Sequence, residues 1–281
     1  MISPKRNTSP VDLERHGDGS SKSARDVVTV EEPMEIRLEV LEADRTVEKS
    51  VSVTMRTPGD DFELTAGFLF TEGLIDGRDA VVDLSYCQDE EPQEYNIVTV
   101  RLRDPAAFDP ALINRNFYMT SSCGVCGKAS LEAIEIRGCK PLPDGPVVHA
   151  DVIRSTPDAL RRAQPVFDRT GGIHAAGLFA PAGELVVLKE DVGRHNAVDK
   201  VIGHELLAER VPLTGHFLAV SGRTSFEIMQ KALAAGIPMV VAVGAPSSLA
   251  VDVARQFNMT LIGFTKPDGF NVYVGPERVG A

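Results

Sequence analysis

The second half of the chain alternates short apolar runs with amphipathic segments, and this alternation constrains the fold more than any other feature. Three apolar runs are separated by segments of about ten residues with helical periodicity. Parallel strands joined by helices form a sheet with helices on both faces. Pro181 and Gly183 favour a turn, so the next run is expected to return antiparallel. The predicted fold class is α/β, a mixed sheet between helix layers. The expected strands are 174–180, 185–189, 216–221, 239–243, 260–264 and 270–274, and the expected helices are 196–209, 225–235 and 249–258.

The first half predicts a smaller α+β domain over residues 26–113. Apolar and polar residues alternate in several of its runs, which is typical of strands. Thr57 and Pro58 favour the start of a helix with Thr57 as its cap. Residues 1–25 have no periodicity and are predicted to form a disordered tail. The expected strands of this half are 34–40, 51–55, 80–86 and 95–102.

Charge and composition exclude several classes of protein. The 281 residues include 29 basic and 40 acidic side chains, a formal net charge of −11. Nucleic-acid and anionic-membrane partners favour the opposite sign, so we expect neither, although a local basic pocket stays compatible. The longest apolar stretch, 236–246, is far shorter than the roughly 20 residues of a membrane span. Four cysteines are too few for a disulfide scaffold and the chain begins without a signal-peptide pattern, so a cytoplasmic location is predicted.

The segment 114–128 is rich in Asn, Ser, Gly and Cys and has neither helical nor strand periodicity. It contains Cys123 and Cys126, which can share a metal, form a disulfide, or act as nucleophile and resolving thiol. Flanking glycines leave the backbone free to move, and Lys128 favours thiolate over thiol. We therefore predict a mobile loop with a sulfur nucleophile, followed by an α/β domain over residues 129–281.

Two other interpretations of the cysteine pair stay open on the residues alone. A structural zinc site needs about four ligands, which Cys87, Cys139 or His149 would have to complete at irregular spacing. A thioredoxin-type redox pair is the other. A zinc-dependent base deaminase is excluded, because no His-x-Glu precedes the pair and Ser122 stands where that motif has proline. By themselves, Cys87 and Cys139 are more typical of buried small apolar residues.

The stretch from Ser221 to Thr224 follows an apolar run and opens a predicted helix, an arrangement typical of anion binding. Gly222 permits close approach of a ligand to the backbone, and Arg223 adds a bidentate donor. Thr224 and Glu227 have the spacing of a capping box. The alternative is a well-capped turn with a surface arginine.

A second candidate also precedes a predicted helix. An acid, a base and an imidazole lie close together in the sequence as Asp191, Arg194 and His195. We therefore expect the Asp191 carboxylate to orient the His195 ring and the Arg194 guanidinium to bind phosphate. The alternative is a helix cap with a satisfied histidine. His174, after a glycine pair, is more typical of a core residue than of a catalyst, and residues 264–269 alone indicate a hairpin loop.

Six motifs, TPGDDFELTAGFLFTEGLI, SSCGVCGKASLE, GGIHAAGLF, EDVGRHNAVDKVIG, SGRTSFEIMQKA and IPMVVAVGAPSSLAVDVA, occur in this order. In order and spacing they resemble the formate dehydrogenase accessory sulfurtransferase family, FdhD, over residues 30–278. The resemblance implies a sulfur carrier that takes persulfide sulfur from a cysteine desulfurase. The implied carrier delivers this sulfur to the bis(molybdopterin guanine dinucleotide) cofactor, which holds molybdenum or tungsten and which formate dehydrogenase needs. It also implies a cytidine-deaminase-like fold, a homodimer and no tightly held metal.

The resemblance assigns the persulfide to Cys123, with Cys126 as the cooperating thiol. The family has an arginine where this chain has Lys266, which shifts the expected phosphate contacts toward Arg194 and Arg223. The expected cofactor-binding residues are Phe264, Thr265, Lys266, Pro267, Asp268, Gly269, Arg194, His195, Ser221, Gly222, Arg223 and Thr224. Two alternatives remain: a chaperone that shields the cofactor without sulfur chemistry, and a structural protein held by zinc.

Overall fold

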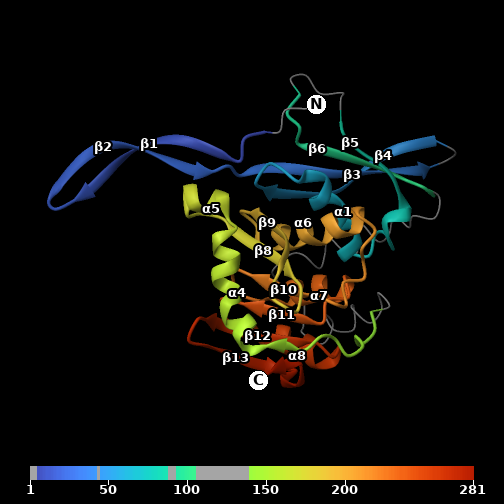
Figure 1. The fold of residues 1–281 in the computed structure, drawn as a ribbon. Helices are drawn as coiled ribbons and strands as arrows, with labels where there is room; N and C mark the ends of the chain where they lie inside the picture. Colours follow the sequence, from blue (N-terminus) through green and yellow to red (C-terminus); the bar gives the residue numbers. More distant parts are fainter. Residues whose placement is uncertain (1–4, 43–44, 88–92, 106–138) are drawn as a thin grey trace.

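The computed structural model describes residues 5–42, 45–87, 93–105 and 139–281 (Figure 1). Its largest element is a six-stranded sheet in the order β13-β12-β11-β10-β8-β9. β10, β11 and β12 are parallel neighbours, whereas β8, β9 and β13 each run antiparallel to the strand they join. The mixed α/β sheet is thus confirmed. The strands are β8 (His174–Phe179), β9 (Leu185–Asp191), β10 (Phe217–Val220), β11 (Met239–Ala242), β12 (Thr260–Lys266) and β13 (Gly269–Val274).

Helices cover both faces of this sheet, which explains why its central strands are continuous apolar runs. α6 (Arg194–Leu207), α7 (Phe226–Ala234) and α8 (Ser248–Gln256) share one core cluster with one face. α4 (Ala150–Arg162) packs on the opposite face, and α5 (Pro165–Thr170) follows it. A short parallel pair, β7 (Val148–His149) with β14 (Val279–Gly280), joins the end of the chain to the start of α4. Neither α4 nor α5 was among the expected helices.

The first half forms a second sheet in the order β4-β3-β6-β5. Its strands are β3 (Glu32–Glu42), β4 (Arg45–Arg56), β5 (Val81–Tyr86) and β6 (Ile97–Leu102). The helix α1 (Asp61–Thr71) packs on its inner face, and Figure 1 shows α1 and α6 between the two sheets. The two helices approach closely at Gly67 and Gly203: a Cβ on Gly67 would lie 1.9 Å from the carbonyl oxygen of Asp199.

Thr57 does not cap α1 as predicted. The N-cap is Asp60, in the left-handed region at φ 56°, without a side-chain cap bond. Thr57 Oγ1 instead accepts from the amide of Val192 at 3.2 Å, and the amide of Thr57 donates to Asp191 at 3.1 Å. Tertiary contacts with the loop after β9 have therefore replaced the local cap.

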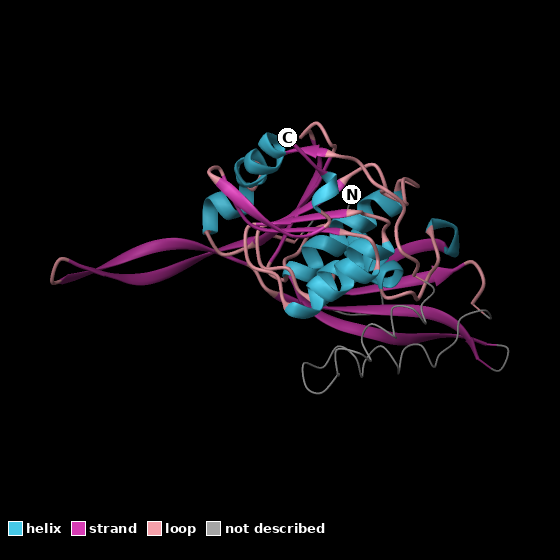
Figure 2. Ribbon diagram, turned by 90° about the horizontal axis from the view of Figure 1, so that it is seen from below, coloured by secondary structure: helices cyan, strands magenta, loops and turns pink. Residues whose placement is uncertain are grey.

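The predicted disordered tail is also wrong over the described residues. β1 (Thr8–Gly17) and β2 (Ser20–Thr29) form an antiparallel hairpin, which we call the arm, and both ribbon views show it projecting from the body (Figures 1 and 2). Its two-residue turn, Asp18-Gly19, has both residues at positive φ, as a tight hairpin requires. Most arm side chains are exposed, so the sequence lacks the apolar alternation of a half-buried strand.

Other sequence-based expectations remain predictions. The predicted mobile loop 114–128 lies outside the described residues, and the likeness to cytidine deaminases is untested. In the part of the chain that the structure describes, no helix is both long and apolar enough to cross a bilayer.

Candidate functional site

The expected binding segments of the second half meet at one edge of the large sheet. The parallel strands β10, β11 and β12 end there. Because β8 is antiparallel to β10, and β9 to β8, the start of β8 and the end of β9 lie at the same edge. Ligands of open α/β sheets bind outside the carboxyl ends of the parallel strands. The topology therefore places the predicted residues where such a site is expected.

The loops after β10 and β12 are joined through the loop after β11. The amide of Gly244 donates to the carbonyl of Gly222 at 3.0 Å, and the amide of Phe264 donates to the carbonyl of Gly244 at 3.1 Å. A Cβ on Gly244 would lie 2.9 Å from the Gly222 oxygen, so only glycine permits this approach. The structure thus brings residues 221–224 and 264–266 together.

The predicted capping box at the start of α7 is wrong. Ser225, not Thr224, is the N-cap. Thr224 is 1% exposed, and its Oγ1 has no hydrogen-bond partner among the described residues. Its backbone instead bridges to Pro246, while the Arg223 side chain stays exposed. Arg223 is therefore available to an anion in solution.

Residues 264–269 form the end of β12, the turn at Pro267 and Asp268, and the start of β13. Phe264 adopts a left-handed backbone, φ 52°, which is strained for an aromatic residue and turns its ring outward, 45% exposed. Thr265 is buried, and its Oγ1 has no partner in the described part of the chain. Lys266 is exposed. The segment thus presents one aromatic ring and one cation at the sheet edge.

Arg194 and His195 begin α6 at the same edge. His195 Nε2 lies 3.2 Å from Ser225 Oγ and 3.7 Å from a carboxylate oxygen of Glu227, two contacts that sequence distance conceals. Burial, followed by the charge of Arg194, lowers the pKa of His195 to about 4. His195 is therefore neutral at pH 7, and Arg194 supplies the positive charge here.

Asp191 does not orient His195, contrary to expectation. It is fully buried and forms an ion pair with Lys200 at 2.7 Å. Its carboxylate also accepts from Asn196 at 2.9 Å and from Gly193 at 2.8 Å. Asp191 thus fixes the loop that presents Arg194, rather than the imidazole.

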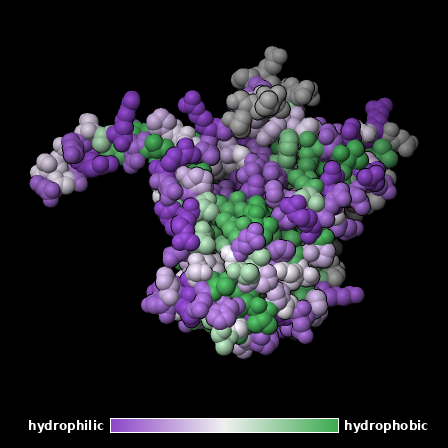
Figure 3. Space-filling view, in the orientation of Figure 1, coloured by the Kyte–Doolittle hydropathy of each residue, from purple (hydrophilic) through white to green (hydrophobic). Residues whose placement is uncertain are grey.

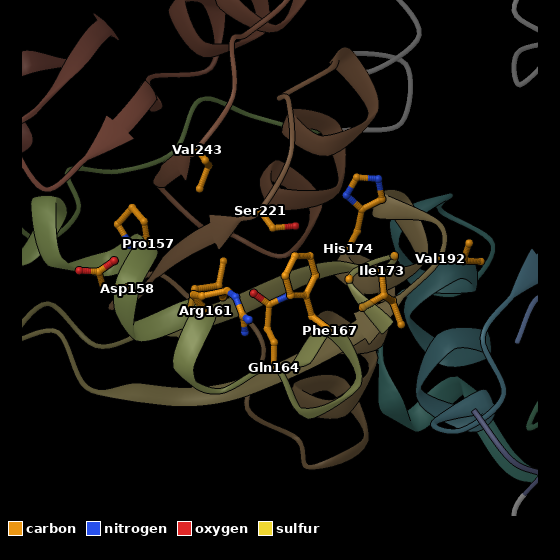
Figure 4. Close-up of a pocket in the computed structure, with 13 residues that line it drawn as sticks. Pro157, Asp158, Arg161, Gln164, Phe167, Ile173, His174, Val192, Ser221 and Val243 are labelled. Atoms are coloured by element: carbon orange, nitrogen blue, oxygen red, sulfur yellow. The ribbon is translucent and has the colours of Figure 1, made fainter. Parts of the chain in front are cut away.

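A cavity of about 580 Å³ opens at the same edge, between the end of α4, α5 and the start of β8 (Figure 4). Of the expected binding residues, only Ser221 lines it; His174 and Val243 also face it. Burial, followed by Arg194, lowers the pKa of His174. The walls are Pro157, Asp158, Leu160, Arg161, Gln164, Phe167, Gly171, Gly172, Ile173, His174, Val192, Ser221 and Val243.

Gln164 is the polar residue that distinguishes this cavity. It is 3% exposed, and its side-chain Nε2 has no hydrogen-bond partner among the described residues. The Arg161 guanidinium lies 4.4 Å from the centre of the Phe167 ring, and Figure 4 shows both side chains beside Gln164. An unpaired buried amide costs free energy, on the order of 1–3 kcal/mol, unless a ligand or water satisfies it. The cavity therefore offers a donor beside an aromatic–guanidinium pair.

Sequence reasoning missed these cavity residues because it missed α4 and α5. A signal was present: Pro165 stands at the first position of α5, a typical helix start, and Ile153, Thr156 and Leu160 form the buried stripe of α4. Glu190 of β9 accepts from the amides of Val166 and Phe167 at 2.9 and 2.8 Å, which holds α5 against the sheet.

Cys123 and Cys126 lie outside the described residues. Cys87 follows β5 and is half-buried, and the half-buried Cys139 packs against the main core cluster. Across residues 5–42, 45–87, 93–105 and 139–281, no group of three or more His, Cys, Asp or Glu side chains is placed to hold a metal ion.

Comparison with known proteins identifies the family. Residues 29–280 match the model of the FdhD/NarQ family. The chain belongs to this family. It is 47% identical to "Sulfur carrier protein FdhD" of Streptomyces avermitilis, over 93% of this chain and 92% of that protein. It is 42% identical to the protein of the same name from Sulfolobus acidocaldarius, over 96% and 97%.

A solved structure also resembles the fold. It is the "putative formate dehydrogenase accessory protein" of Desulfotalea psychrophila, 25% identical, with a TM-score of 0.72. The alignment covers 98% of this chain and all of that one. The likeness therefore includes both sheets.

Proposed function

We propose that this protein is a sulfur carrier in formate dehydrogenase maturation. Cys123 receives sulfur from a cysteine desulfurase as a persulfide and passes it to the bis(molybdopterin guanine dinucleotide) cofactor, which is the substrate. Membership of the FdhD/NarQ family, with full-length relatives named sulfur carrier proteins, supports the sulfur-carrying part. A homodimer in the cytoplasm belongs to the same proposal.

The two thiols give a balanced transfer when an external thiol serves as reductant. In loading, the Cys123 thiolate attacks the terminal sulfur of the donor persulfide, and the donor cysteine leaves as a thiolate. In delivery, the Cys126 thiolate attacks the inner sulfur of the Cys123 persulfide, so that the outer sulfur departs as sulfide to the metal. A Cys123–Cys126 disulfide forms, which an external thiol reduces before the next cycle.

The cavity at the sheet edge is the observation that supports the cofactor part of the proposal. A guanine ring is flat and has hydrogen-bonding groups on its edge. The Arg161–Phe167 pair provides a stacking surface, and Gln164 Nε2 provides a donor that no described residue accepts. Asp158, which also lines the cavity, provides a carboxylate acceptor for ring N–H groups. The volume of about 580 Å³ lies within the usual range for small-molecule sites.

The charges at the same edge suit the pyrophosphate groups of this substrate. Arg194 begins α6, and Arg223 lies exposed before α7. Free backbone amides at helix starts favour anions, and guanidinium groups bind phosphate through paired hydrogen bonds. A few local cations thus serve a large anionic substrate in a chain with a net charge of −11.

Activation of formate dehydrogenase tests the proposal against a chaperone without sulfur chemistry. Cells that lack the wild-type chain are complemented with Cys123→Ala, Arg223→Ala or the control Cys87→Ala. We expect loss of activity with Cys123→Ala, reduced activity with Arg223→Ala and full activity with Cys87→Ala. Full activity with Cys123→Ala would favour the chaperone.

A further inference from the structure

The short helix α5 forms part of the cavity wall, yet its first turn has no cap from its own sequence. Gln164 is the N-cap residue, and its side chain makes no cap hydrogen bond. That side chain lines the cavity instead, beside the ring of Phe167 (Figure 4). A helix of six residues is too short to be stable on its own backbone bonds, so α5 depends on contacts from other parts of the fold.

Glu190 of β9 supplies the missing cap. Its two carboxylate oxygens accept from the amide of Val166 at 2.9 Å and from the amide of Phe167 at 2.8 Å. These are the two N–H groups of the first turn that need an acceptor outside the helix. Pro165 has no N–H, and the amide of Asp168 donates back to the N-cap carbonyl at 3.1 Å. One carboxylate from a distant strand thus replaces the local cap.

The first turn of α5 places the groups that would meet a planar base. Gln164 directly precedes this turn, and Phe167 belongs to it. Asp168 pairs with Arg161 at 2.5 Å, while the Arg161 guanidinium lies 4.4 Å from the centre of the Phe167 ring. Glu190 itself is not among the residues that line the cavity. A shift of this turn would therefore move the donor and the stacking surface together.

The last turn of α5 has a separate anchor on the root of the arm. Thr170 Oγ1 lies 2.9 Å from Thr29 Oγ1, and Arg169 donates to the side-chain oxygen of Asn7 at 3.1 Å. The rest of the arm extends away from the body and has hydrophilic colour at its tip (Figure 3). Loss of the Glu190 contact would thus free the first turn of α5, whereas the last turn would stay attached.

We propose that Glu190 is a positioning residue for the nucleotide base: its carboxylate fixes the first turn of α5, so that Gln164 and Phe167 meet the ligand. This role rests on the proposed function, in which the cavity takes the guanine ring. Glu190→Gln keeps the shape of the side chain but replaces one acceptor oxygen by an NH2 donor. One of the two amides then faces a donor and has no acceptor, which loosens the turn.

The affinity of the full-length chain for GDP, measured by isothermal titration calorimetry, tests this role. We expect Glu190→Gln to bind GDP about tenfold more weakly than wild type. The control Glu184→Gln makes the same change at the exposed residue before β9 and should bind as wild type does. In a Gln164→Leu background, Glu190→Gln should cause a further loss of only about threefold, because the donor is already absent and only the stacking surface is affected. Equal fold losses in the two backgrounds would overturn the proposal.

Inorganic pyrophosphate separates positioning of the base from general destabilisation, since it has phosphate charges but no base. Its affinity should be the same in Glu190→Gln and in wild type, which also shows that the variant is folded. An equal loss for pyrophosphate and GDP would overturn the proposal. A loss of GDP affinity in Gln164→Leu without one in Glu190→Gln would overturn the role of Glu190 alone. Equal GDP affinity in wild type, Gln164→Leu and Glu190→Gln would overturn the cavity as the base site as well.

Discussion

At the residue scale, the site combines residues that pattern reasoning found with residues it missed. Arg194, His195 and Arg223 were expected from local sequence, and the topology places their segments at one sheet edge. Gln164 was not expected, because an amide that is buried with no partner among the described residues is recognisable only once its surroundings are known. Local patterns thus indicate charged turn residues, whereas burial of a polar side chain depends on the whole fold.

Gln164 gives a direct test of the cavity as a nucleotide site. Replacement of Gln164 by Leu keeps the side-chain size but removes the donor. We expect the affinity for GDP, measured by isothermal titration calorimetry, to fall about tenfold, because one hydrogen bond to a buried ligand is worth about 1 kcal/mol or more. Gln256→Leu, an exposed glutamine on α8 across the sheet, serves as control. Equal GDP affinity in both variants would show that the base does not contact Gln164.

His195 predicts a dependence of stability on pH. Its folded pKa of about 4 lies below the ordinary value of 6.5, so between these values the unfolded chain binds the proton and the folded chain does not. Stability from this group is therefore lost as the pH falls from about 6.5 toward 4, by at most about 3 kcal/mol. Urea denaturation across this range should show a shallower loss for His195→Gln than for wild type. Parallel curves would contradict the assignment.

At the scale of elements, the periodicity of apolar residues predicts the strands and helices correctly where an element buries at least one face. The six strands and three helices expected in the second half are all present, with ends shifted by a few residues. The arm was missed because both its faces are largely exposed, and only the Asp18-Gly19 turn pointed to it. The caps at Thr57 and Thr224 were wrong because distant loops engage these residues: Thr57 Oγ1 accepts from the amide of Val192, and the backbone of Thr224 bridges to Pro246.

The crossing of α1 and α6 predicts a strong effect of one methyl group. In Gly67→Ala, the new Cβ would meet the Asp199 carbonyl at 1.9 Å, which forces the helices apart. Overpacking of this kind outweighs the gain in helix propensity, and we expect a loss of at least about 2 kcal/mol in the free energy of unfolding.

Gly215→Ala is the control for this crossing, because nothing lies within 4 Å of its added Cβ. Its free energy of unfolding should match that of wild type within about 0.5 kcal/mol. Chemical denaturation of the three proteins gives the comparison. A Gly67→Ala variant as stable as the control would show that the two helices lie farther apart than described.

At the scale of the whole molecule, α6 and two buried lysines, each paired with a buried aspartate, join the halves. Lys200 pairs with Asp191 and also donates to the carbonyl of Thr57, and Lys231 pairs with Asp199 at 2.9 Å and donates to Thr71. Burial of paired charges costs desolvation, and removal of one partner leaves the other uncompensated. Through Lys200, which contacts both Asp191 and Thr57, the loop that precedes Arg194 is held against the segment that precedes α1.

This junction predicts that Lys231→Met destabilises the whole chain by about 3–5 kcal/mol, because the buried Asp199 and the half-buried Glu72 then lose this cation. The double variant Lys231→Met with Asp199→Asn removes the isolated charge and should recover part of the loss. Thermal unfolding followed by circular dichroism measures both. No recovery in the double variant would mean that Lys231 acts through packing alone.

Sulfur loading of Cys123 is the central claim, and intact mass spectrometry tests it most directly. The wild-type chain is incubated with a cysteine desulfurase and cysteine, then measured without reductant beside Cys123→Ala and the control Cys139→Ala. The account predicts a gain of one sulfur atom on wild type and on Cys139→Ala, removed by added thiol, and no gain on Cys123→Ala. An equal gain on Cys123→Ala, or none on wild type, would contradict it.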